Sequence, residues 1–146
     1  MVRLQLFEFE DKAWLPIIFR DMITDAIQYD IDKYKIYDSI APMLQKTMKQ
    51  LKVNHIIDLC SGGSGPLLRF YKMFESDDFP IKVTFTDKYP NTKSIQKIES
   101  YKDNINYIDR SIDAMDIPSN LKGIRTMFTS FHHFPPEQAK LILQNA

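Results

Sequence analysis

A run of nine residues constrains the fold of this chain more than any other feature. Residues 58–66 read Asp-Leu-Cys-Ser-Gly-Gly-Ser-Gly-Pro and lie between an apolar run, 55–57, and a helix-like segment, 67–74. A strand, a glycine turn that carries an acid, and a helix are typical of nucleotide-binding α/β proteins. Glycines let backbone approach a ligand closely, and a helix start offers unpaired N–H donors. The run therefore predicts a ligand-binding turn after a buried strand.

The order of acid and glycine separates two kinds of nucleotide site. A dinucleotide site has G-x-G-x-x-G directly after the strand, and a P-loop ends in Gly-Lys-Ser/Thr. Here Asp58 precedes the first glycine by four residues, and Gly65 is followed by Pro66. A carboxylate at this point is unfavourable beside a pyrophosphate and favourable beside a sulfonium or an ammonium. The turn therefore disfavours a nicotinamide or flavin enzyme. A tight strand–helix turn without a ligand is the alternative.

This turn resembles the first motif of the class I S-adenosylmethionine-dependent methyltransferases. The family places glycine two, four and six residues after the acid, and these positions are Cys60, Gly62 and Ser64 here. The resemblance implies S-adenosylmethionine as the cofactor, with S-adenosylhomocysteine as the product. It assigns the methionine end of this donor to the turn, through Asp58, Cys60, Ser61, Gly62, Gly63 and Gly65.

A second acid follows the next predicted strand. Asp87 comes 29 residues after Asp58, at the end of residues 81–86. In nucleotide-binding α/β folds an acid at this point accepts hydrogen bonds from the ribose hydroxyls. The two oxygens of a carboxylate can take a vicinal diol together. We therefore predict that Asp87 binds the ribose; an ordinary turn at a strand end is the alternative.

Residues 111–118, Ser-Ile-Asp-Ala-Met-Asp-Ile-Pro, resemble a third signature of the same family. Carried over by position, Asp113 would accept from the exocyclic amine of adenine. Ala114 would present its N–H to the ring, and Met115 would lie on the adenine face. A turn or cap role for Asp113 is the alternative.

A pair of histidines follows the fourth predicted strand. Residues 129–136 read Thr-Ser-Phe-His-His-Phe-Pro-Pro, which resembles the His-His segment of many small-molecule methyltransferases, where catalytic or donor-facing groups such as Ser130 lie. His132 or His133 could take a proton from a hydroxyl acceptor, because imidazole titrates near neutral pH. The alternative is a loop that closes over the donor or precedes the last helix.

The order of predicted elements gives the fold class. Strands are expected at 53–59, 81–86, 105–108 and 124–130, and helices at 16–29, 34–51, 65–75, 91–101 and 135–146. A break or restart of the second helix at Pro42 is the alternative for that element. The first helix shows an apolar stripe at helical spacing, namely Ile17, Ile18, Met22, Ile23, Ala26 and Ile27. Alternating strands and helices favour an α/β fold with a parallel sheet. We expect a three-layer α/β/α Rossmann-like sheet of strand order 3-2-1-4, with two N-terminal cap helices.

The family sheet has seven strands, whereas four are predicted here. We therefore expect a helical cap at 1–52 and a partial donor-binding domain at 53–146, as in a truncated methyltransferase. The fourth strand would be an exposed edge, which self-association could cover as a homodimer. A small-molecule acceptor is the expected substrate. The alternative function is a donor-binding module, or an inactive fragment, without turnover.

Composition narrows the possible partners. The chain has 146 residues, 19 basic and 19 acidic, and hence no net charge that would favour nucleic acid. No apolar run is long enough to span a membrane. One cysteine excludes an internal disulfide. We expect a cytoplasmic protein without a metal site.

Overall fold

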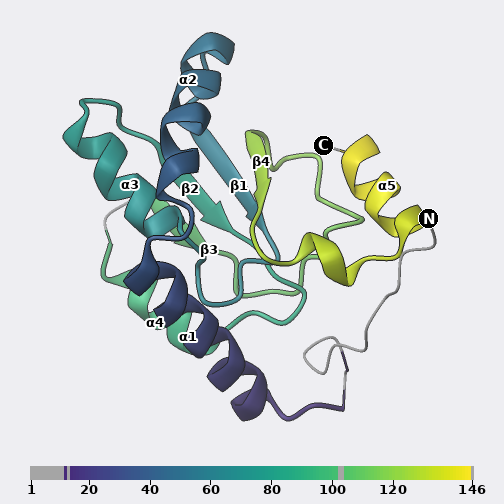
Figure 1. Ribbon diagram of the computed structural model, residues 1–146. Helices are drawn as coiled ribbons and strands as arrows, with labels where there is room; N and C mark the ends of the chain where they lie inside the picture. The colour runs from purple at the N-terminus through teal and green to yellow at the C-terminus, as the bar shows by residue number, and fades with distance from the viewer. Residues whose placement is uncertain (1–11, 13, 102–103, 146) are drawn as a thin grey trace.

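The computed structural model describes residues 12, 14–101 and 104–145. In these residues two N-terminal helices precede a segment of four strands and three further helices (Figure 1). The helices are α1 (Ile17–Tyr34), α2 (Ala41–Leu51), α3 (Leu67–Ser76), α4 (Thr92–Glu99) and α5 (Pro136–Gln144). The strands are β1 (His55–Leu59), β2 (Lys82–Phe85), β3 (Ile105–Tyr107) and β4 (Ile124–Met127). Two short 3-10 helices, η1 (Asp38–Ile40) and η2 (Phe131–His133), precede α2 and α5.

The four strands form one parallel sheet in the order β3-β2-β1-β4. This confirms the predicted strand order and the α/β class. The register pairs Asp58 of β1 with Phe85 of β2 and with Thr126 of β4. Because parallel strands end at the same edge of a sheet, the loops that follow them meet there.

Two apolar clusters are built from alternate residues of β1. Ile56 belongs to a cluster with residues of α2, α3 and α4, whereas Ile57 and Leu59 pack with Ile142 of α5. Successive side chains of a strand point to opposite faces, so the clusters lie on the two faces of the sheet. In Figure 1, α2 and α3 lie on one side of the strands and α5 lies on the other.

The helix boundaries follow local chemistry. The side chain of Asn91 accepts a hydrogen bond from Ser94 N at 2.8 Å and so caps the start of α4. The second helix begins at Ala41 rather than near Tyr34, because α1 continues to Tyr34 and ends at Lys35 in a left-handed conformation. Pro42 stands in the first turn of α2, where proline is tolerated.

Helix α1 buries a different face from the one that the sequence predicted. Its predicted apolar stripe is mostly exposed, and its buried side chains are instead Arg20, Asp21, Gln28 and Ile31. Among the described residues, no side chain of α1 belongs to either apolar cluster. Helical spacing predicted the element correctly and its inner face wrongly, because the surface beneath α1 is polar. The large exposed apolar side chains of α1 are Ile17, Ile18, Phe19, Met22, Ile27, Tyr29 and Tyr34.

Strand β4 is an edge strand, as predicted, and each of its residues is half-buried. The guanidinium of Arg125 donates a hydrogen bond to the carbonyl of Asn145, so the C-terminal segment lies against this strand. Within the described part of the chain, no helix combines the length and apolar character needed to cross a bilayer.

Candidate functional site

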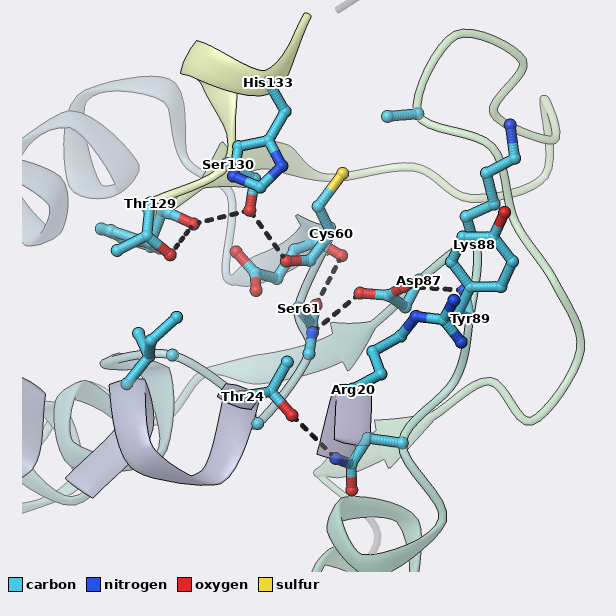
Figure 2. A pocket seen from close by; sticks show the side chains of 18 of the residues that line it. Arg20, Thr24, Cys60, Ser61, Asp87, Lys88, Tyr89, Thr129, Ser130 and His133 are labelled. Carbon is cyan, nitrogen blue, oxygen red and sulfur yellow. Dashed lines mark hydrogen bonds between the residues drawn. The ribbon is translucent and has the colours of Figure 1, made fainter. Parts of the chain in front are cut away.

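A cavity of about 660 Å³ lies at the carboxyl ends of the strands. The loops that follow β1, β2, β3 and β4 line it together with α1 (Figure 2). It brings together all the residues that the sequence singled out: Asp58, Cys60, Ser61, Gly62, Gly63, Gly65, Asp87, Asp113, Ala114, Met115, Ser130, His132 and His133. Segments from Arg20 of α1 to Gln138 of α5 thus line one site.

Asp58 is the most deeply buried acid of the cavity, with 1% of its surface exposed. Thr126 Oγ1 of β4 donates to its Oδ1 at 2.7 Å. Burial raises the pKa of Asp58 to about 7, although the hydrogen bond from Thr126 opposes this, and nearby Asp87 raises it further. The site therefore holds a carboxyl group that titrates near neutral pH, because few dipoles replace its lost water.

Asp87 links the first two loops. Its Oδ2 accepts from Gly62 N at 2.8 Å and its Oδ1 accepts from Tyr89 N at 2.8 Å. Burial raises the pKa of Asp87, and these two N–H groups and the charge of Arg20 oppose it. Each oxygen already has one backbone partner, and a carboxylate oxygen can accept more than one hydrogen bond. The group can therefore receive a diol without releasing the loops.

Asp113 is held between two donors. Met115 N donates to its Oδ1 and Lys88 Nζ lies 2.9 Å from its Oδ2. Burial would raise the pKa of Asp113, but the Met115 N–H and Lys88 outweigh it, so the pKa is lowered. The side chain of Lys88 is more than half exposed, and an exposed ion pair is weak. A ligand amine can therefore share or replace Lys88 on this carboxylate at small cost.

The glycine turn packs against α1. A Cβ added to Gly62 would lie 3.2 Å from Thr24 Cγ2, and one added to Gly63 would lie 3.0 Å from Gln28 Cβ. Figure 2 shows Thr24 of α1 next to this turn. The room that these two glycines make is therefore filled by a helix, and the turn and α1 form one wall.

Two residues of the turn keep glycine-like conformations without being glycine. Cys60 has φ 54° and Ser64 has φ 87°, both in the left-handed region. These are two of the positions at which the resembled family has glycine. The backbone shape is thus retained, at a cost of roughly 1–2 kcal/mol for each residue that carries a Cβ there.

Ser64→Gly should therefore raise the free energy of unfolding by about 1–2 kcal/mol. Ser64 is fully buried, and its Oγ has no hydrogen-bond partner among the described residues, so the change removes both strain and an unpaired hydroxyl. Denaturant unfolding measures it. Ser61→Gly is the matched control: Ser61 Oγ donates to Asp58 O and accepts from Thr86 N, so that variant should lose stability. Equal effects of the two variants would contradict this account.

The loop after β4 supplies the opposite wall. Ser130 Oγ donates to Cys60 O at 3.3 Å and so joins this loop to the turn. The rings of His132 and His133 lie 4.3 Å apart, edge to face. Figure 2 shows the ring of His133 and the sulfur of Cys60 on the same side of the cavity. An imidazole pair next to the turn is suited to proton transfer or to contact with a second substrate.

The sequence interpretation missed the contribution of α1. Arg20, Thr24 and Gln28, spaced four residues apart, line the cavity. The guanidinium of Arg20 lies 4.0 Å from the ring centre of Tyr89, and Asn91 Nδ2 donates to Thr24 Oγ1 at 3.0 Å. The polar i, i+4, i+8 spacing of these residues on a predicted helix could have indicated a polar inner face. The more regular apolar stripe on the same helix led to the other interpretation.

The charged side chains that line the cavity are mostly acidic. They are Asp21, Asp58, Asp87 and Asp113 against Arg20 and Lys88. An excess of carboxylates in a partly enclosed site favours a cationic ligand and opposes a polyphosphate.

Comparison with known proteins finds no family model, no curated protein and no solved structure that matches this chain. The function must therefore be argued from the chemistry of the site.

Proposed function

We propose that this chain binds S-adenosylmethionine and transfers its methyl group to an acceptor, which we expect to be a small molecule. The observation that carries this proposal is the convergence of Asp58, Asp87 and Asp113 with the glycine turn on one cavity. A sulfonium nucleoside with an amino-acid tail presents a diol, an adenine amine and two cationic centres. The three acids and the glycine turn complement these features of the donor.

Each part of the cavity has a role in this proposal. Asp87 accepts from the ribose diol, and Asp113 accepts from the adenine amine beside Lys88, with Ala114 and Met115 along the ring. The glycine turn and Asp58 take the methionine end. The sheet is then the donor-binding sheet of a three-layer Rossmann-like domain, and the N-terminal helices act as its cap.

Methyl transfer itself needs little from the protein beyond position. An acceptor lone pair attacks the methyl carbon, and the carbon–sulfur bond breaks with its electrons moving to sulfur, which yields S-adenosylhomocysteine. Holding both partners in line supplies much of the rate. If the acceptor is a hydroxyl, its proton goes to a base, and His132 or His133 is the candidate.

A thermal-shift comparison tests donor binding. S-adenosylhomocysteine at about 100 times its dissociation constant should stabilise the folded chain by about 2.7 kcal/mol. For a chain of this size this corresponds to a rise in Tm of roughly 5–10 °C. NAD and FAD should give no shift, because their pyrophosphates meet the acids of the cavity. A shift with the dinucleotides and none with S-adenosylhomocysteine would refute the proposal.

Turnover separates an enzyme from a binding module. The chain is incubated with methyl-tritiated S-adenosylmethionine and a small-molecule extract, and label outside the donor fraction is counted. Labelled product that is lost in a His132→Ala/His133→Ala variant, with donor affinity retained, supports catalysis at the histidine pair. Donor binding without labelled product supports the module.

A further inference from the structure

Helix α1 is attached to the body of the protein by polar contacts. Gln28 Nε2 donates to Gly65 O at 2.9 Å, Thr24 accepts from Asn91, and Asp25 pairs with Lys93 at 2.9 Å. Ile31 is the buried apolar side chain of α1 among the described residues, and no α1 side chain belongs to either apolar cluster. Around Thr24 and Gln28 the helix is thus a polar wall of the cavity.

The amide of Gln28 has a fixed orientation. Its Nε2 donates to two groups that only accept, Gly65 O and Asp32 Oδ2, both at 2.9 Å. A flipped amide would lose both hydrogen bonds, so Oε1 is the remaining acceptor. Gln28 is 8% exposed and lines the cavity beside the turn.

The acceptor oxygen of this amide is unsatisfied. Gln28 Oε1 is buried and has no hydrogen-bond partner among the described residues. Buried polar atoms are almost always paired, because leaving one unpaired is costly. Only a donor, either N–H or O–H, can pair with this oxygen. A ligand that brings such a donor next to Gly63 and Gly65 would supply the missing hydrogen bond.

We propose that Gln28 accepts a hydrogen bond from the α-ammonium group of the bound donor and so selects nucleosides with a free amino-acid end. This inference rests on the proposed function. The turn against which Gln28 packs is the part of the site assigned to the methionine end, and the ammonium is the only strong hydrogen-bond donor there. The proposal includes a small shift of the Gln28 side chain or of α1 on ligand binding, because Oε1 is buried in the structure. Gln28 is thereby a specificity-determining residue supplied by the N-terminal segment.

A comparison of two ligands tests this role. Isothermal titration measures the affinities of S-adenosylhomocysteine and of its analogue with hydrogen in place of the α-amino group. The wild-type chain should prefer the amino compound by roughly 10- to 100-fold, the scale of a hydrogen bond to a charged group. In Gln28→Leu the preference should fall by about fivefold or more. General damage to the site weakens both ligands and leaves their ratio unchanged.

Two further variants sharpen the result. Gln28→Glu keeps an acceptor oxygen and should retain the preference even if overall affinity falls. Gln45→Leu is the matched control. Gln45 lies on α2, its Nε2 donates to the carboxylate of exposed Asp77, and neither residue lines the cavity. Its ratio should equal that of wild type, and a ratio that falls as it does in Gln28→Leu would overturn the inference.

The experiments distinguish a failure of the Gln28 inference from a failure of the proposed function. If wild type binds S-adenosylhomocysteine and Gln28→Leu keeps the full preference, the Gln28 inference alone is overturned. If wild type binds neither compound, the proposed function falls and this inference falls with it.

Discussion

Replacing Asp87 with alanine should weaken S-adenosylhomocysteine binding by roughly 10- to 150-fold. This corresponds to about 1.5–3 kcal/mol, the range for hydrogen bonds to a charged group. The carboxylate holds Gly62 N and Tyr89 N at 2.8 Å each and has capacity for two hydroxyls in addition. Isothermal titration measures the loss. Asp109→Ala is the matched control, because Asp109 is an exposed acid that follows β3 and is not part of the cavity lining.

The same substitution also releases two backbone N–H groups, so it will lower stability. A ligand comparison separates this effect from ribose recognition. Wild type should bind the 2′-deoxy analogue of S-adenosylhomocysteine about tenfold more weakly than the parent, whereas Asp87→Ala should bind both alike. An Asp87→Ala variant that still discriminates the two compounds would place the ribose elsewhere.

The sheet was readable from sequence because each strand carries its own signal. β1 contains the apolar pair Ile56 and Ile57 before Asp58, and β2 contains Val83 and Phe85 and is followed by Asp87. Alternation with helices leaves few parallel orders. The predicted strand order is therefore confirmed. The inner face of α1 was not readable. Apolar spacing assumes that a helix packs on an apolar surface, and α1 packs instead on the glycine turn and on Asn91.

The candidate site likewise has features that the sequence predicts and features that it does not. Residues that stand directly after strands converge, because parallel strands deliver their ends to one edge. Contacts between segments that are far apart in the sequence could not be predicted and are seen only in the structure. The Lys88 ion pair on Asp113, Arg20 on Tyr89, and Gln28 on Gly65 join segments whose separation in sequence carries no periodic signal.

Donor affinity should fall about tenfold between pH 8 and pH 6, because of Asp58. The pKa of Asp58 is raised to about 7 in the folded chain. A cationic ligand favours the carboxylate and lowers that pKa, so binding releases a proton and weakens as pH falls through 7. Titrations at several pH values measure this. The Asp58→Asn variant should bind weakly and with little pH dependence, whereas His132→Gln/His133→Gln should keep the wild-type dependence.

The same group should make the empty protein less stable at high pH. The pKa of Asp58 is higher in the folded chain than the ordinary value of 3.8. Its stabilising contribution is therefore complete below about pH 4 and is lost as pH rises through about 7. Asp58→Asn keeps an oxygen for Thr126 and cannot ionise. Its stability advantage over wild type should grow by roughly 2–3 kcal/mol between pH 5 and pH 8.

A stabilising substitution that abolishes binding would show that Asp58 is kept for a ligand rather than for the fold. Denaturant unfolding of wild type and Asp58→Asn at both pH values measures the difference, in which the contributions of titrating groups distant from Asp58 cancel. A difference that does not change with pH would mean that Asp58 stays ionised in the folded chain. The acid would then be a structural partner of Thr126, and the pH-dependent binding expected above would be absent as well.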